Sequence, residues 1–113
     1  MTPNEYQELA MHTAPYGIFD SYMDALDNAA LGMCGESGEF ADIVKKHIYQ
    51  GHGIEGQHLA RELGDVMWYV AMGAQAIGYS LEEIMKLNIE KLNARYPEGF
   101  DAERSQNREE GDI

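Results

Sequence analysis

The sequence has few of the residues that disulfides or nucleic-acid binding require. Cys34 is the only cysteine, so an intramolecular disulfide and a cysteine-based metal site are both excluded. Eight basic residues stand against 20 acidic ones, which gives a net charge of −12. Because binding to a nucleic-acid backbone requires clustered basic side chains, we expect no nucleic-acid partner.

Long apolar runs are also missing. No run approaches the roughly 18 residues that a membrane-spanning helix needs. The first 30 residues carry acidic side chains and no apolar segment of the kind found in signal peptides. We therefore expect a cytoplasmic protein without a membrane partner. The hydrophobic fraction of 44% argues against disorder, and Cys34 is expected to be a small side chain in or near the core.

Helix signals dominate what is present. Thr2-Pro3-Asn4-Glu5 reads as a capping box with proline at the first helical position, which predicts a short helix to about residue 14. Apolar residues at spacings of three and four predict helices over about 21–49 and 55–77. Ser80 and Glu83 form a second capping box, which predicts a fourth helix that ends before Pro97.

These helices are joined by short loops, so the sequence predicts an all-α, antiparallel bundle of about four helices. We expect one domain over residues 1–97. Residues 98–113 form a polar tail that is either disordered or laid across a neighbouring surface. Gly32, Gly35 and Gly38 lie three apart in the second helix, where each costs about 1 kcal/mol relative to alanine. Such a cluster indicates a close approach by another helix or a local bend.

Two pairs of acids, each pair three residues apart, lie on the core-facing sides of neighbouring helices. Glu36 falls inside the apolar stripe of the second helix, and Glu39 lies at its edge. Glu62 and Asp65 occupy similar positions on the third helix. Acidic side chains on such a face are rarely buried unless they are paired or bound to metal. Antiparallel packing of these helices would bring up to four carboxylates together.

Clustered carboxylates repel one another, and a divalent cation offsets that repulsion well. Oxygen ligands without cysteine or histidine favour Mg²⁺ or Mn²⁺ over Zn²⁺. A di-iron site is less favoured because the residues three after Glu36, Glu39 and Glu62 are Glu39, Asp42 and Asp65, whereas such sites use Glu-x-x-His. Acid pairs are common on solvated helix faces, so a single pair would be weak evidence for a metal. Two pairs on adjacent helices are stronger evidence.

Other polar and aromatic residues leave alternatives open. Lys91 and Arg95 share a face at the end of the fourth helix, where they either hold a polyphosphate or form a solvated pair. Lys45 and Lys46 are interpreted as a solvated cationic face. Trp68 and Tyr69 are either core aromatics, the favoured reading, or walls of a nucleobase pocket. The four histidines show no metal spacing and receive no role.

Three segments together resemble the MazG-like family of all-α nucleoside triphosphate pyrophosphohydrolases. They are Gly35-Glu36-Ser37-Gly38-Glu39, Arg61-Glu62-Leu63-Gly64-Asp65-Val66, and Lys91-Leu92-Asn93-Ala94-Arg95-Tyr96-Pro97-Glu98-Gly99-Phe100. The resemblance covers roughly residues 25 to 108. It implies a helical bundle that assembles as a homodimer or homotetramer. It also implies Mg²⁺-dependent cleavage of the α–β bond of (d)NTPs, which gives a monophosphate and pyrophosphate in a housecleaning role.

The resemblance further implies a role for each matching residue. Glu36, Glu39, Glu62 and Asp65 would be metal ligands, and Glu36 or Glu39 would orient or deprotonate the attacking water. The triphosphate would be contacted by Lys91, Arg95 and Tyr96, with Asn28 as a weaker candidate for nucleotide contact. Two alternatives remain beside this enzyme: a metal- or nucleotide-binding module without turnover, and a purely structural oligomeric bundle.

Overall fold

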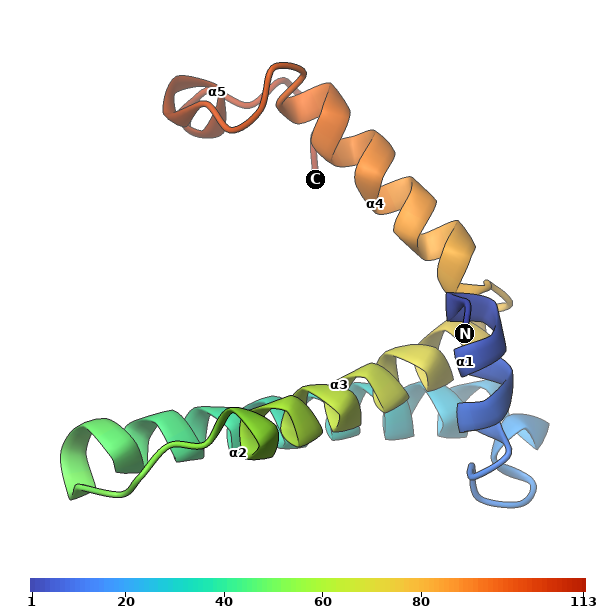
Figure 1. Ribbon diagram of the computed structural model, residues 1–113. Coiled ribbons are helices and arrows are strands. Elements are labelled where there is room, and N and C mark those ends of the chain that lie inside the picture. Colours follow the sequence, from blue (N-terminus) through green and yellow to red (C-terminus); the bar gives the residue numbers. More distant parts are fainter. The chain divides into compact units, whose positions relative to one another are not determined.

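The computed structural model describes residues 1–113 and contains helices but no strand (Figure 1). The all-α prediction is therefore confirmed. The elements in order are α1 (Pro3–Met11), a 3₁₀ turn η1 (Ile18–Asp20), α2 (Tyr22–Gln50), α3 (Gly56–Ile77), α4 (Leu81–Arg95) and α5 (Ala102–Gln106). The chain divides into two compact units, Met1–Leu81 and Glu82–Ile113. None of the helices combines the length and apolar character needed to cross a membrane.

The predicted capping box opens α1. The backbone N–H of Glu5 donates to the Thr2 hydroxyl at 3.1 Å, and the Thr2 N–H donates to the Glu5 carboxylate at 3.3 Å. The helix ends at Met11, earlier than predicted. The Thr13 hydroxyl donates to the backbone carbonyl of Ala10 at 2.6 Å, and such local side-chain bonds compete with continued helix.

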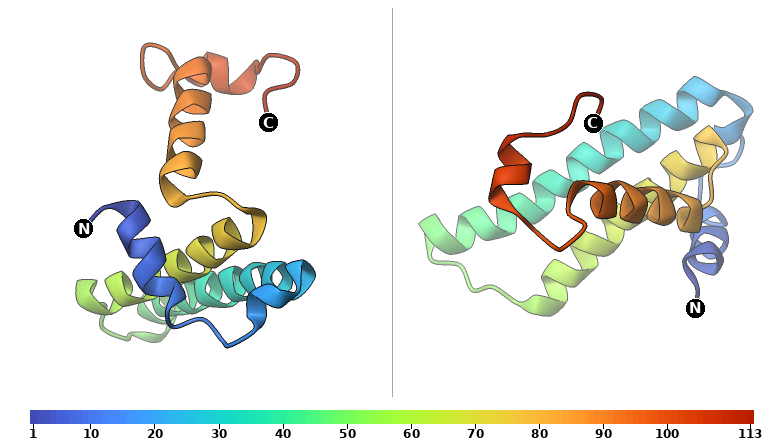
Figure 2. Two further views of the ribbon diagram at one scale, coloured as in Figure 1. Left: turned by 90° about the vertical axis from the view of Figure 1, so that its right-hand side faces the viewer. Right: turned by 90° about the horizontal axis from the view of Figure 1, so that it is seen from above.

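The long helices α2 and α3 run antiparallel, side by side (Figures 1 and 2). Ser21 caps the start of α2 by accepting from the Asp24 N–H at 3.3 Å. Gly51 ends α2 with a left-handed φ of 69°, and Gly78 ends α3 in the same way at 78°. Both helices keep the predicted limits to within one or two residues, because these caps are local signals that sequence reveals.

Small residues let α2 and α3 approach closely. The buried apolar residues of this pair are Ala25, Ala29, Ala71, Met72 and Ala74. A Cβ placed on Gly32 would overlap the ring of Tyr69, whereas a Cβ on Gly35 or Gly38 would meet nothing within 4 Å. The predicted close approach is therefore confirmed, but only at the first of the three glycines.

Two polar side chains join α1 and the turn after it to α3 and the residues that follow α3. The Gln7 side chain is buried; it accepts from the Leu81 N–H at 2.8 Å and donates to the Tyr79 carbonyl at 3.1 Å. The Trp68 ring N–H donates to the Thr13 hydroxyl at 2.7 Å and to the Ala10 carbonyl at 3.1 Å. These bonds confirm a structural role for Trp68.

The prediction that Cys34 lies in or near the core is wrong, because its side chain is exposed. Cys34 lies two residues, or about 200° around the helix, from both Gly32 and Glu36, whose face meets α3. The prediction relied on the usual burial of cysteine and not on this position around the helix. Several large apolar side chains are also exposed on α2 and α3, among them Leu31, Leu63 and Met67.

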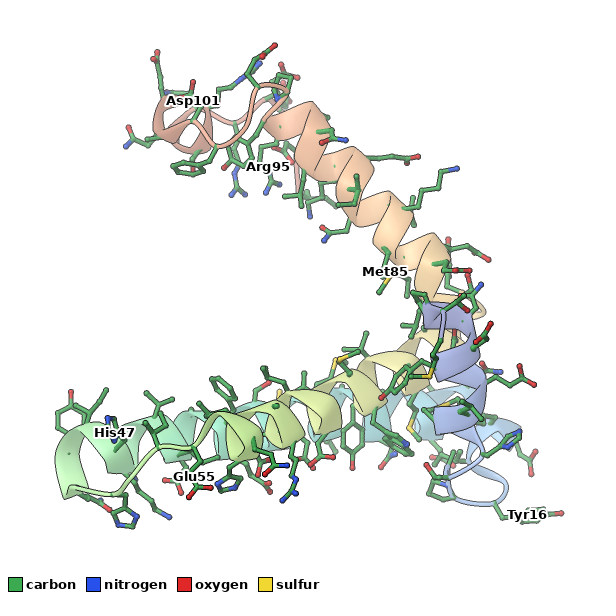
Figure 3. All side chains as sticks on the ribbon, in the orientation of Figure 1. Tyr16, His47, Glu55, Met85, Arg95 and Asp101 are labelled. Atoms are coloured by element: carbon green, nitrogen blue, oxygen red, sulfur yellow. The ribbon has the colours of Figure 1, made fainter.

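In the second unit the polar tail folds back on the end of α4. Asp101 caps α5 by accepting from the backbone N–H of Glu103 and of Arg104. Further along, Asp112 pairs with Arg95 of α4. Figure 3 marks Arg95 at the end of α4 and Asp101 at the start of α5. The described tail thus contains α5 and a segment that returns to Arg95.

Candidate metal centre

Three of the four predicted carboxylates meet where α2 packs against α3. Glu36 of α2 and Glu62 and Asp65 of α3 each offer one oxygen atom, and these atoms lie within 4.8 Å of one another. The three-residue spacing places Glu62 and Asp65 on one face of α3. The antiparallel packing then brings that face to Glu36, as the helical patterning predicted.

Two oxygen atoms of this cluster are buried without a partner. Neither Oε2 of Glu36 nor Oε2 of Glu62 has a hydrogen-bond donor, and the Glu62 side chain is only 14% exposed. A buried acceptor without a donor is costly, more so when it carries charge. Partial burial, the negative charges of Glu39, Asp65 and Glu62, and a hydrogen bond with Glu39 raise the pKa of Glu36. A divalent cation would offset each of these costs, so the donor set fits such an ion.

Glu39 lies one turn after Glu36 but outside the three-carboxylate cluster, with its side chain exposed. It lines a hollow of about 570 Å³ beside the cluster, together with Glu62 and His58. Its negative charge still acts on Glu36. The structure thus brings three of the four predicted acids together and leaves the fourth at the edge.

His58 is a neighbour of the cluster that received no role from the sequence. Its Nε2 lies 3.4 Å from Glu62 Oε1. The spacing of four residues on one helix could have indicated this pair. The same hollow is lined by Lys46, but Lys45 and Lys46 both pair with Asp42, at 3.2 and 2.8 Å. These pairs agree with the interpretation of the two lysines as a solvated face.

On its other side the cluster borders aromatic side chains. Glu36 and Asp65 line a hollow of about 270 Å³ with Trp68 and Tyr69. The two rings pack edge to face, with their centroids 4.9 Å apart. Tyr6 of α1 has a raised pKa because it is partly buried and because the negative charge of Asp65 acts on it. Aromatic surface therefore adjoins the carboxylates directly.

The predicted substrate-contacting residues are divided between the two units, with Asn28 alone in the first. The Asn28 amide donates to the Met72 sulfur at 2.9 Å, and no contact joins it to the carboxylates. Lys91, Arg95 and Tyr96 belong to the second unit. Lys91 is exposed there, and Arg95 is paired with Asp112. The ring of Tyr96 packs beside that of Phe100, with the two centroids 5.4 Å apart.

The sequence model of the MazG nucleotide pyrophosphohydrolase domain matches residues 26–100, which include all four acids and run through α4. This chain belongs to the MazG family. It is also similar to the Gene 37 protein of Mycobacterium phage L5, with 39% identity over 101 residues. That match covers 83% of this chain and 88% of the phage protein. No solved structure matches the chain.

Membership of the MazG family explains why carboxylates occupy the packed face of two helices. The family's fold is all-α, as observed, and its members are nucleotide pyrophosphohydrolases that typically use a divalent metal. The three-carboxylate cluster is an arrangement that such an ion fits. The family resemblance of the sequence is thus confirmed.

Proposed function

We propose that this protein is a Mg²⁺-dependent nucleoside triphosphate pyrophosphohydrolase. It would cleave the α–β bond of (d)NTPs into a monophosphate and pyrophosphate, as a housecleaning enzyme of the cytoplasm. The observation that carries the proposal is the pair of buried carboxylate oxygens, on Glu36 and Glu62, that have no hydrogen-bond donor. MazG membership supplies the reaction class.

Glu36, Glu62 and Asp65 would hold the metal, and Glu39 would complete the ligand set from the exposed edge. Mn²⁺ suits the same oxygen ligands. When bound, the ion supplies neutralisation of charge on the phosphoryl oxygens and a lowered pKa of water. Negative charges on the neighbouring carboxylates contribute to the raised pKa of Glu36, and a bound cation would offset their repulsion.

Glu39 is our preferred candidate for the residue that orients the attacking water and accepts its proton. Its carboxylate is exposed and faces a hollow, whereas Glu36 is half-buried within the cluster. Lys91, Arg95 and Tyr96 would bind the phosphate chain, with Arg95 offering a two-pronged guanidinium. Asn28 would contact the nucleotide. Bond cleavage then depends on alignment of the water and stabilisation of phosphoryl charge.

We further propose that the chain acts as a homodimer or homotetramer, with residues 1–97 as one MazG-like domain. The exposed apolar side chains of α2 and α3 support assembly, since large exposed apolar patches mark association surfaces. The family match supports one domain because it runs without interruption past Leu81, where the two compact units divide.

The test is a panel of NTPs and dNTPs incubated with Mg²⁺ and assayed for monophosphate and pyrophosphate. We expect both products from wild type and from Asp27→Asn, whose side chain lies half a turn around α2 from Glu36. Glu39→Gln and Asp65→Asn should abolish both while circular dichroism shows intact helices. Full turnover in both variants, or release of orthophosphate instead, would overturn the proposal. Mg²⁺-dependent nucleotide binding without any product would indicate a binding module.

A further inference from the structure

Half of the chain's basic residues gather around one hollow in the second unit. The sequence has eight lysines and arginines, and four of them, Lys91, Arg95, Arg104 and Arg108, line a hollow of about 300 Å³. Sites for small ligands span roughly 300–1,000 Å³, so this one lies at the small end. On a chain with a net charge of −12, such a concentration of positive charge needs an explanation.

The guanidinium of Arg95 in this hollow is already hydrogen-bonded to a carboxylate. Arg95 Nε and Nη2 donate to the two oxygens of Asp112 at 2.8 and 2.6 Å. The Arg95 side chain is only 10% exposed and that of Asp112 20%. A guanidinium presents its paired N–H groups to a phosphate in the same way as to a carboxylate. Asp112 therefore stands where a phosphate oxygen pair would bind.

The other cations act on the same carboxylate. The hydrogen bonds from Arg95 are the main cause of the lowered pKa of Asp112, and the charges of Arg108 and Lys91 lower it further. None of Lys91, Arg104 and Arg108 forms an ion pair within 4 Å.

If the hollow served only to hold the C-terminal segment in place, the pair of Arg95 with Asp112 would be sufficient. That role does not explain why three further cations line the hollow. The acidic side chains that line the hollow are Glu109, Glu110 and Asp112. Displacing Asp112 would leave four positive groups against two negative ones.

We propose that Lys91, Arg95, Arg104 and Arg108 form a polyphosphate-binding pocket and that Asp112 is its built-in competitor. A phosphate chain enters by displacing Asp112 from Arg95. Within the proposed function, on which this inference rests, Arg104 and Arg108 thereby join Lys91 and Arg95 as binding residues. Two ligands share the required chemistry, the triphosphate of the substrate and the pyrophosphate product.

The test is calorimetric titration of the full chain, without divalent metal, with inorganic tripolyphosphate and separately with pyrophosphate. Asp112→Asn should bind tripolyphosphate about tenfold more tightly than wild type, because the competitor loses its charge. Glu98→Gln removes one negative charge outside the pocket and should bind like wild type. Asp112→Glu keeps the charge and should also stay close to wild type.

The cationic side is tested in the same titration. Arg104→Gln and Arg108→Gln should each weaken binding about tenfold, whereas Lys86→Gln, an equal loss of charge outside the pocket, should change it less than twofold. A larger loss for tripolyphosphate than for pyrophosphate would assign the pocket to the substrate. The reverse would assign it to the product. Circular dichroism of each variant shows whether the helices persist.

Failure of this inference is distinct from failure of the proposed function. The inference is overturned if Asp112→Asn binds no more tightly than Glu98→Gln, if the arginine variants match Lys86→Gln, or if no binding is seen. NTP hydrolysis by wild type would then still stand. Conversely, tight tripolyphosphate binding with the expected variant pattern, but no NTP hydrolysis, would support the polyphosphate pocket and overturn the proposed enzymatic function.

Discussion

The ring of Tyr69 fills the space that a side chain at Gly32 would occupy. Gly32 therefore stays in the middle of α2 despite its poor helix propensity, because only a hydrogen atom fits beneath the ring. This contact sets the separation of α2 and α3 one turn before Glu36. The distance between the carboxylates of the two helices depends on it.

Gly32→Ala should destabilise the fold by about 1–3 kcal/mol, since overpacking forces the ring or the helix to move. Gly35→Ala is the matched control. It lies three residues on, its Cβ would meet nothing within 4 Å, and it should gain up to about 1 kcal/mol in helix propensity. Urea unfolding of both variants measures the difference. Equal stability of the two would show that the Tyr69 contact does not constrain the helices.

The contrast between these glycines shows how far sequence reasoning reaches. Three glycines in one helix predicted a close approach, but nothing in the spacing distinguished Gly32 from Gly35 or named Tyr69 as the partner. Helix limits were predicted well because caps such as Ser21 and Gly51 act on their own neighbours. Contacts between helices depend on axial register, which a single chain's periodicity leaves undetermined.

Mg²⁺ should stabilise the wild-type fold through the carboxylate cluster. At 100 times its dissociation constant an ion adds about 2.7 kcal/mol, which corresponds to a rise in melting temperature of about 10 °C. In Glu62→Gln the rise should fall below about 2 °C, whereas Asp27→Asn should keep it in full. Thermal melts with Mg²⁺ or with a chelator provide the measurement. An undiminished rise in Glu62→Gln would place the ion elsewhere.

Without metal, the charge on Glu36 should reduce stability as the pH rises. The raised pKa of Glu36 means that the folded state resists its ionisation more than the unfolded state does. Well below the ordinary glutamate value of 4.5 the side chain is protonated in both states, so its ionisation does not change the stability. The cost then builds as the pH rises through the folded-state pKa.

Glu36→Gln keeps the uncharged form at every pH, so it isolates this effect from other titrating groups. In chelator, the variant should melt at a higher temperature than wild type at pH 8, and the two should converge well below pH 4.5. A pH series of thermal melts on both proteins tests this. A difference that does not change with pH would mean that packing, not ionisation, separates them.

Gln7 should contribute more to stability than an ordinary polar residue on α1. Its replacement by alanine leaves the Leu81 N–H without its acceptor and the Tyr79 carbonyl without this donor. We expect a loss of about 1–3 kcal/mol in denaturant unfolding. Gln57→Ala, at an exposed position on α3, should change stability by less than about 0.5 kcal/mol. Similar losses for both variants would contradict this account.

At the candidate site, helical patterning predicted that the four acids lie on or beside the packed faces of two helices. It did not predict which of them form the three-carboxylate cluster. Glu39 and Asp65 are both exposed and each follows a clustered acid by three residues, so this spacing did not reveal that only Asp65 joins the three-carboxylate cluster. The pairing of Arg95 with Asp112 was not predicted either. Polar tails carry no periodic signal, so their contacts emerge only from coordinates.

The alanine-lined seam between α2 and α3 has a thermodynamic consequence. Because small residues fill the seam, bulky apolar groups such as Leu31 and Leu63 remain 74% and 50% exposed. If a second copy covers them, as we propose, folding and association become a single equilibrium. Dilution alone would then lower the melting temperature, and the abundance of the protein in its cell would set the fraction that is native.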